Sequence, residues 1–196
     1  MTQCQTIAAG EIEPVSLLID VAAILHDSFP EFYGLFTSPD KELFANLTNQ
    51  MLKPSTEISD TYVLVDNGTV LGALSWYPAE QAAIRQMSSL KSLIALPDTP
   101  KDIMSNLVSF RNSVPSADLE GAYLARIAIK AEYQGKGLGK ALLQDFEAKA
   151  LDEGFTRTCL HVHQDNAKGI GFYKAAGYTI RKQAKANYFV MTKSIG

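Results

Sequence analysis

Cysteine, tryptophan and histidine are scarce in this chain of 196 residues, which holds two, one and three of them respectively. Cys4 and Cys159 form neither a disulfide framework nor a Cys/His zinc spacing, so we expect no structural metal. So few cysteines suit a reducing compartment, and we expect a cytoplasmic protein. The first residues lack a basic segment followed by an apolar one, which argues against a signal peptide.

An excess of charge of either sign is also missing. The formal net charge is −3 and the pI about 5.6, so we expect no nucleic acid as main partner. No apolar stretch is long enough to span a bilayer, so we expect no membrane partner. Hydrophobic residues make up 46% and charged residues 20%, as in ordinary soluble domains. At this length we expect one domain over residues 1–196.

Apolar periodicity and turn residues predict the order of elements. A short strand at 5–8 precedes helices at 14–26 and 40–52, and Asn67-Gly68 forms the turn of a hairpin over 61–76. Helices at 80–96 and 101–110 are predicted inside the segment 78–120. The rest reads as strands at 123–129, 156–163, 178–184 and 188–193, with helices at 137–153 and 167–176. Strand–helix–strand repetition favours a mixed α/β sheet with a right-handed crossover.

A glycine-dense loop lies where the strand at 123–129 leads into a helix. Gly135, Gly137 and Gly139 allow positive φ and leave no Cβ in the way of a ligand. The free N–H groups and dipole of a helix start favour an anion, and Lys136 and Lys140 add positive charge. The pattern indicates a pyrophosphate site, although a glycine-rich turn without a ligand would look similar.

Two common nucleotide motifs do not fit this loop. A Walker loop needs Ser or Thr after Gly-Lys, but Ala141 follows Gly139-Lys140. A dinucleotide fingerprint needs a glycine where Lys140 or Leu142 stands. Gln134, Gly137 and Gly139 instead match Gln/Arg-x-x-Gly-x-Gly/Ala. In this loop the chain resembles the GCN5-related N-acetyltransferase (GNAT) family, whose motif binds the pyrophosphate of coenzyme A.

A second segment strengthens the resemblance. Asn166 to Tyr178 is similar to the family's Asn-x-x-Ala-x-x-Phe-Tyr-x-x-x-Gly-Phe/Tyr pattern, except that Gly169 replaces the usual alanine. The resemblance implies an α/β (α+β) fold. This fold has a mixed, mostly antiparallel twisted sheet with a splayed central strand pair, flanked by helices. The helical insertion at about 78–120 then precedes the coenzyme-binding strand.

The resemblance also implies an activity and its residues. Acetyl-CoA would donate its acetyl group to a primary amine of a small molecule or peptide, by direct attack in a ternary complex. Backbone groups of Ile127 or Ile129 would orient the thioester and stabilise the oxyanion. Tyr173 would protonate the leaving thiolate, although an aromatic packing role fits it too. The coenzyme contacts so implied are Ile127, Ala128, Ile129, Gln134, Gly135, Lys136, Gly137, Leu138, Gly139, Lys140, Asn166 and Tyr173.

The general base is less closely defined. His161 stands five residues before Asn166, where some family members that acetylate α-amines carry a glutamate. An ordinary pKa near 6.5 would suit His161 to the task, and a hydrogen-bonded strand histidine is the alternative. Glu120 is a further candidate for the base, with a solvated carboxylate as the favoured interpretation. His163 shares a strand face with His161.

Other features leave the acceptor open. The segment 78–120 is interpreted as a lid, a contact of a homodimer or an added helical layer, with Leu90, Leu93, Ile94 and Leu96 assigned to the core. Phe29, Phe32, Tyr33 and Phe36 are candidates for an acceptor wall, where Glu31 could attract an amine. A non-catalytic acetyl-CoA sensor or regulatory domain is the alternative function.

Overall fold

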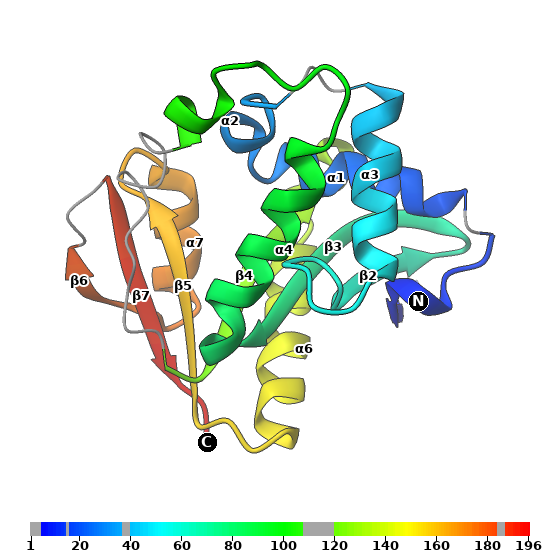
Figure 1. Ribbon diagram of the computed structural model, residues 1–196. Helices are drawn as coiled ribbons and strands as arrows, with labels where there is room; N and C mark the ends of the chain where they lie inside the picture. The colour runs from blue at the N-terminus through cyan, green and yellow to red at the C-terminus, as the bar shows by residue number, and fades with distance from the viewer. Residues whose placement is uncertain (1–4, 15, 37–39, 108–119, 184–186) are drawn as a thin grey trace.

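The computed structural model describes residues 5–14, 16–36, 40–107, 120–183 and 187–196. In this part of the chain seven strands form one sheet with helices on both sides (Figure 1). The strands are β1 (Gln5–Ala8), β2 (Thr61–Asp66), β3 (Thr69–Pro78), β4 (Ala122–Ile129), β5 (Arg157–His163), β6 (Thr179–Gln183) and β7 (Tyr188–Ser194). The helices are α1 (Leu17–Asp27), α2 (Pro30–Tyr33), α3 (Lys41–Leu52), α4 (Ala82–Ile94), α6 (Leu138–Asp152) and α7 (Ala167–Ala175). Short 3-10 turns cover Ala9–Glu11, Ala79–Gln81 and Ala131–Tyr133.

The strand order is β1-β2-β3-β4-β5-β7-β6. Among the described strands β4 and β5 pair in parallel, and each other neighbouring pair is antiparallel. The predicted fold class, a mixed and mostly antiparallel sheet flanked by helices, is therefore confirmed. β7 lies between β5 and β6, an order that local sequence patterns do not specify.

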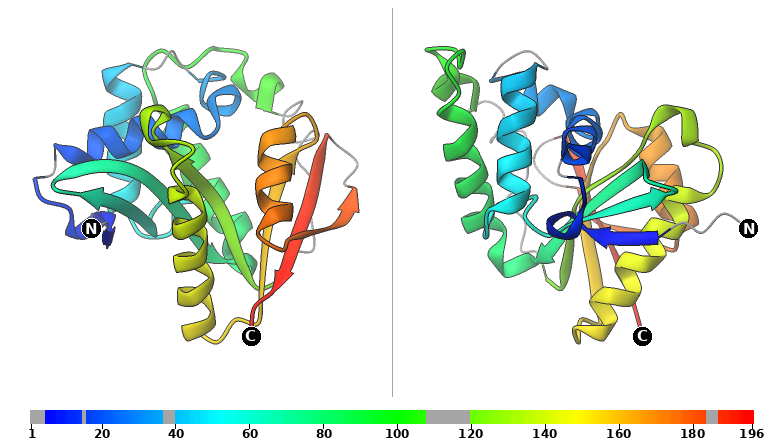
Figure 2. Two further views of the ribbon diagram at one scale, coloured as in Figure 1. Left: turned by 180° about the vertical axis from the view of Figure 1, so that it is seen from behind. Right: turned by 90° about the vertical axis from the view of Figure 1, so that its right-hand side faces the viewer.

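The central parallel pair separates along its length. β4 pairs with β5 over Ala122–Leu124, opposite Thr158–Leu160. Both strands then continue, to Ile129 and His163, without pairing with each other. Figure 2 shows the two strands meeting near the C-terminal end of the chain and diverging above it. The predicted splayed pair is thus present, and the gap opens at the carboxyl ends of both strands.

Each face of the sheet carries its own helical layer. α1, α3 and α4 cover one face, and α6 and α7 cover the other (Figure 2). The first layer packs through apolar side chains such as Leu25, Leu47 and Leu93. The second packs through Leu142, Phe146 and their neighbours. The gap between β4 and β5 therefore lies between two separately packed helical layers.

Local signals explain most element boundaries. The Asp40 side chain accepts a hydrogen bond from Leu43 N–H at 2.9 Å and caps α3. Asn67 and Gly68 have φ of 47° and 74°, as their hairpin turn requires. α1 begins at Leu17, later than predicted from Pro14, and the short helix α2 at Pro30 was not predicted.

The insertion forms part of the packed structure where it is described. Leu93 and Leu96 are buried, and Leu90 and Ile94 pack against the same core, as predicted. A further helical stretch covers 103–107, while the rest of the predicted helix at 101–110 lies outside the described residues. These contacts favour the interpretation as an added helical layer. No helix in the described part is both long and apolar enough to cross a membrane.

Candidate active site

The glycine loop forms the start of α6. Gly135 and Gly137 have φ of 77° and 80°, and Gly137 occupies the N-cap position. A Cβ at either glycine would meet no heavy atom within 4 Å. The Ala141 N–H bonds back to Gly137 O at 3.1 Å, so the N–H groups of the first turn before it have no intrahelical acceptor. This arrangement gives an anion open access to aligned backbone donors.

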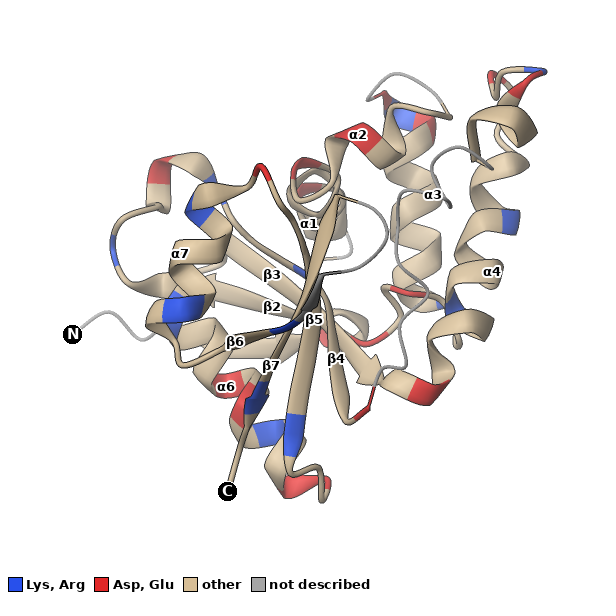
Figure 3. Ribbon diagram, turned by 90° about the vertical axis from the view of Figure 1, so that its left-hand side faces the viewer, with Lys and Arg blue, Asp and Glu red and all other residues tan. Residues whose placement is uncertain are grey.

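Side chains tie the loop to its neighbours and add charge. Gln134 donates to the Ile129 carbonyl at 3.0 Å and accepts from Lys168 Nζ at 2.8 Å. Lys136 lies over the ring of Tyr133 at 5.0 Å. Figure 3 shows basic positions on α7 and on the loop beside it. Lys168 was not predicted from the sequence, although a lysine in the first turn of a helix beside a predicted anion site is a usable signal.

The end of β4, the start of α6 and α7 meet beside the gap. A Cβ at Gly139 would lie 3.6 Å from Phe172 and 3.7 Å from Ile129. Ile127, Ile129, Leu138 and Tyr173 pack against one core cluster, whereas Ala128 packs against the cluster on the opposite face. Most residues predicted to contact the coenzyme are therefore neighbours, despite coming from distant parts of the chain.

Asn166 caps α7. Its side-chain oxygen accepts a hydrogen bond from Gly169 N–H at 2.8 Å. A Cβ at Gly169 would lie 2.7–2.9 Å from the Asn166 side-chain atoms, closer than real Cβ contacts allow. The glycine that departs from the family pattern is therefore explained by this tight cap. It leaves room for the Asn166 amide.

Tyr173 lies on α7, half-buried between other rings. Its ring centroid is 5.2 Å from that of Phe172 and 5.8 Å from that of Tyr178. Burial raises the pKa of the Tyr173 hydroxyl above its ordinary value of 10. The phenol is protonated at neutral pH, as an ordinary tyrosine would be, so it carries the proton that a donor needs.

His161 lies on β5 and faces the α1 side of the sheet. Its Nδ1 is 3.1 Å from the Tyr123 hydroxyl, and its Nε2 is buried without a partner among the described residues. Burial lowers the pKa of His161 to about 4, below the ordinary value used in the sequence analysis. The imidazole is therefore neutral at pH 7, with a proton on one of its two ring nitrogens. His163 on the same face has its ring 5.0 Å from that of Tyr188.

Glu120 lies apart from this group. It precedes β4 at the closed end of the strand pair, where its carboxylate is 2.7 Å from Arg157 Nη1 and 3.7 Å from Arg181 Nη1. The gap opens at the other end of β4, roughly 20 Å along an extended strand. Its side chain is 63% exposed. We therefore do not retain Glu120 as a candidate base, because an ion-paired surface carboxylate accounts for it.

A buried polar group that the sequence analysis did not identify lies beside the gap. Arg126 of β4 is 3.6 Å from Glu57, and its guanidinium lies 4.9 Å above the Phe29 ring. Tyr33 is buried close to it, so two of the predicted aromatic wall residues surround this cation. Glu31 is exposed on α2, and its negative charge contributes to the raised pKa of Tyr188. A charged residue inside the apolar strand Ala122–Ile129 is the signal that could have identified Arg126.

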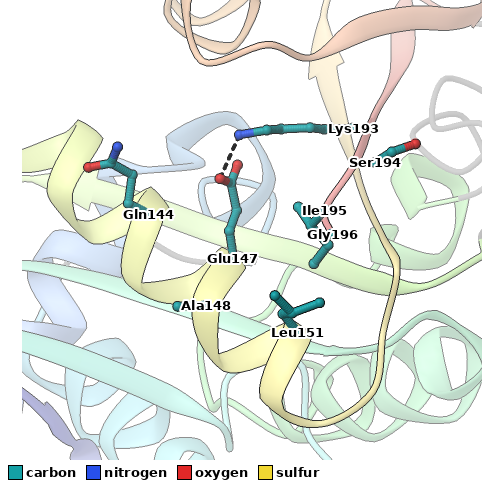
Figure 4. A pocket seen from close by; sticks show the side chains of 8 residues that line it. All are labelled: Gln144, Glu147, Ala148, Leu151, Lys193, Ser194, Ile195 and Gly196. Carbon is teal, nitrogen blue, oxygen red and sulfur yellow. Dashed lines mark hydrogen bonds and ion pairs between the residues drawn. The ribbon is translucent and has the colours of Figure 1, made fainter.

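Other chemical groups lie outside this arrangement. Cys159 is buried, and burial raises the pKa of its thiol to about 12, so no thiolate nucleophile is available there. Within the described ranges, no cluster of His, Cys, Asp and Glu side chains could hold a metal ion. A surface hollow of about 400 Å³ lies between α6 and the end of β7, lined partly by the Glu147–Lys193 ion pair (Figure 4). None of the predicted site residues lines it.

Comparison with known proteins agrees with this geometry. The sequence profile of the acetyltransferase (GNAT) family matches residues 20–178. The chain belongs to the GNAT family. A spermidine N(1)-acetyltransferase of Thermoplasma acidophilum is 33% identical over 72 residues, which are 37% of this chain and 44% of that protein. A [ribosomal protein bS18]-alanine N-acetyltransferase of Escherichia coli strain K12 is 35% identical over 77 residues, 38% of this chain and 49% of that protein. The chain thus spans about half the length of these two curated relatives.

Solved structures of the GNAT family share the fold. The PaiA N-acetyltransferase of Thermoplasma acidophilum, in complex with coenzyme A, superposes with a TM-score of 0.55. The comparison covers 99% of each chain at 15% sequence identity. At this identity the likeness establishes the fold, and the roles of individual residues have to be argued from their own geometry.

Proposed function

We propose that this GNAT chain transfers the acetyl group of acetyl-CoA to a primary amine of a small molecule or peptide. The observation that carries the proposal is the gap between β4 and β5 with the glycine loop at its edge. Relatives that acetylate spermidine and a ribosomal-protein alanine, and a fold neighbour in complex with coenzyme A, support the amine and the donor. Their acceptors differ from each other, so neither acceptor is assigned to this chain.

The residues present fit coenzyme A. Gly135 and Gly137 leave room against the first-turn N–H groups of α6, where the pyrophosphate would bind. Lys136, Lys140 and Lys168 would supply positive charge around it. When bound, acetyl-CoA supplies an activated acetyl thioester. The unpaired stretch of β4 at Ile127 and Ile129 would hold the pantetheine amides and the thioester carbonyl.

Tyr173 and His161 would handle the two protons. The amine nitrogen forms a bond to the acetyl carbon, and the bond from that carbon to sulfur breaks. Tyr173, on the α7 side, would donate its hydroxyl proton to the leaving thiolate. His161, on the α1 side, would accept the proton that the amine releases. The two groups thus flank the gap from opposite faces of the sheet, which fits a donor and an acceptor entering from opposite sides.

Two measurements test the proposal. Acetyl-CoA at a hundred times its Kd should raise the free energy of unfolding by about 2.7 kcal/mol, whereas ATP and NAD should have no effect. Release of free thiol with a panel of polyamines, amino acids, aminoglycosides and peptides should reveal an accepted amine. Binding without thiol release for any amine would instead favour an acetyl-CoA sensor or regulatory domain.

A further inference from the structure

Arg126 owes its orientation to a bulge in β4. Ser75 of β3 pairs with Arg126, but the next residue, Trp76, pairs with Leu124, so Ala125 is an extra residue in β4. A bulge re-aims the side chains that follow it. It places Arg126 on the same face as Tyr123, against Phe29 of the α1 layer. The chain thereby buries a guanidinium one residue before Ile127, beside the proposed acetyl-transfer position.

The guanidinium is buried but incompletely bonded. Its Nη1 donates to the Ala125 carbonyl at 2.8 Å, a side-chain hydrogen bond joins the guanidinium to Tyr33, and the side chain is only 8% exposed. Nη2 lies 3.6 Å from Glu57, longer than the roughly 2.7–2.9 Å of a charge-assisted hydrogen bond. The Nε atom has no partner among the described residues. A buried donor without a hydrogen-bond partner lowers the stability of the fold, so the open Nε–H of Arg126 requires an explanation.

A second unsatisfied atom lies across the gap. His161 Nε2 is also buried without a partner in the described part of the chain, and His161 Nδ1 is 3.1 Å from the Tyr123 hydroxyl. The positive charge of Arg126 opposes the rise in the pKa of Tyr123 and of Tyr188, so Arg126 lies in the same region as both rings. The two side chains present an open Nε–H of Arg126 and an open ring nitrogen of His161 on the face opposite α6 and α7. An anionic group and an amine on one small molecule would satisfy both.

We propose that Arg126 binds a carboxylate of the acceptor, so that the acceptor is a free amino acid. This inference rests on the proposed acetyltransferase function. The planar guanidinium matches a carboxylate, and its open Nε–H supplies a donor for it. A polyamine carries several positive charges, and it would bring them close to the buried Arg126 cation. The nearby carboxylate of Glu57 is already paired with Arg126, so it is not free to neutralise them. An amino acid matches the Arg126–Glu57 pair in carrying one charge of each sign.

Matched acceptors test the substrate class. L-Phenylalanine, L-phenylalaninamide and phenethylamine differ only at the carboxylate, and the comparison extends to the other common amino acids with their amides. We expect kcat/KM for the best amino acid to exceed that of its amide and of its decarboxylated amine at least tenfold, in thiol-release assays of the full chain. Spermidine should be a poorer acceptor still. Equal or better rates with the amide, the decarboxylated amine or spermidine would overturn the inference.

Variants assign the effect to Arg126. Arg126→Lys keeps the charge but loses the planar donor set, so KM for the amino acid should rise about tenfold while KM for the amide stays constant. The control Arg85→Lys changes another buried arginine, bound to Asp60, Ser59 and the Thr56 carbonyl, and should leave both values unchanged. An unchanged preference for the carboxylate in Arg126→Lys would contradict the role of Arg126.

A binding measurement separates this inference from the proposed function. The double variant Arg126→Gln with Glu57→Gln removes both charges together, so no buried charge is left unpaired. Calorimetric titration of L-phenylalanine and its amide into the chain with coenzyme A should show preferential carboxylate binding that this variant loses. If no amine releases thiol but this preference persists, the acetyltransferase proposal fails and the carboxylate site stands. If the amino acid and its amide bind to the wild-type chain with the same Kd, the proposed carboxylate site is wrong.

Discussion

Burial moves the pKa values of the two central side chains further from neutral pH. It raises the pKa of Tyr173, which keeps the phenol protonated, and it lowers the pKa of His161 to about 4, which keeps the imidazole neutral. One desolvation effect thus favours the uncharged form of both groups, the protonated phenol and the neutral imidazole. Neither shift is evident from the residue types alone.

Replacing Tyr173 with Phe should lower kcat about a hundredfold, because the leaving thiolate loses its proton donor. The coenzyme Kd should stay constant, since the ring and its packing against Phe172 remain. Steady-state kinetics and calorimetry measure the two values. Tyr178→Phe is the matched control, because that buried hydroxyl accepts a hydrogen bond from Thr158 outside the proposed chemistry. An unchanged kcat in Tyr173→Phe would remove this residue from the mechanism.

His161 should affect stability in a defined pH window. Its pKa is lower in the folded chain, about 4, than its unfolded value of 6.5, so the unfolded state binds more protons between these values. The free energy of unfolding should therefore decrease as pH falls, by roughly 2 kcal/mol between pH 7 and pH 5 from this group. Urea unfolding of wild type and His161→Gln measures the difference. If both lose stability equally, the imidazole is not buried as the structure shows.

The same pKa shift bears on catalysis. A base with a pKa of about 4 gives an acidic limb in the kcat/KM profile near pH 4, not near 6.5. Substituting His161 with Ala should lower the plateau and remove that limb. If the profile is the same in the variant, a water chain or another group removes the proton.

At the scale of elements, α6 is bounded by two glycines with different tasks. Gly137 at its start and Gly154 after its end both have positive φ, 80° and 89°, and a Cβ would be unobstructed at either. Substituting either with Ala should therefore destabilise the fold by a similar amount, about 1 kcal/mol. Only the loop at Gly137 faces the proposed ligand.

This pair gives a test of the loop. Gly137→Ala should raise the Kd for coenzyme A about tenfold, because a methyl group and a strained backbone would disturb the first-turn N–H donors. Gly154→Ala should leave that Kd unchanged while lowering Tm by a similar few degrees. Calorimetric titration and thermal unfolding measure both effects. Equal coenzyme affinities in the two variants would contradict a pyrophosphate site at this loop.

At the scale of the whole molecule, the two halves of the sheet are joined where β4 pairs with β5, a short stretch that we call the seam. β4 and β5 pair only over Ala122–Leu124 and Thr158–Leu160 within the described residues, and the gap depends on this closed end. Gly121 starts the seam with φ of 93°, and a Cβ there would lie 2.2 Å from the Arg157 carbonyl oxygen. Both the conformation and the close approach require glycine at this position.

Replacing Gly121 with Ala should destabilise the fold by roughly 3 kcal/mol or more, since the backbone of β4 or β5 must move. For a chain of this size that lowers Tm by about 6–12 °C. Gly68→Ala is the control, because Gly68 has φ of 74° in an exposed turn but no close neighbour. Thermal unfolding measures both. A similar Tm in the two variants would show that the seam tolerates a side chain.

Local chemistry explains what could be predicted from sequence. The glycine loop, the Asn67-Gly68 turn and the Asp40 cap each involve residues a few positions apart, and their conformations follow from backbone preference and nearby donors. The two family motifs are local in the same sense. They were sufficient to predict the family, the fold class and the loop, and the structure places most of the implied coenzyme contacts together.

The acceptor side depended on the tertiary structure. Arg126, Glu57 and His161 come from distant positions, and a single extra residue at Ala125 decides which face Arg126 occupies. Strand order and bulges follow from the pairing of many residues across the sheet, so no local pattern specifies them. Burial then shifts the pKa values of Tyr173 and His161. The amino-acid sequence by itself thus determined the glycine loop at the start of α6, because its conformation is local, while packing decided which polar groups meet beside the gap.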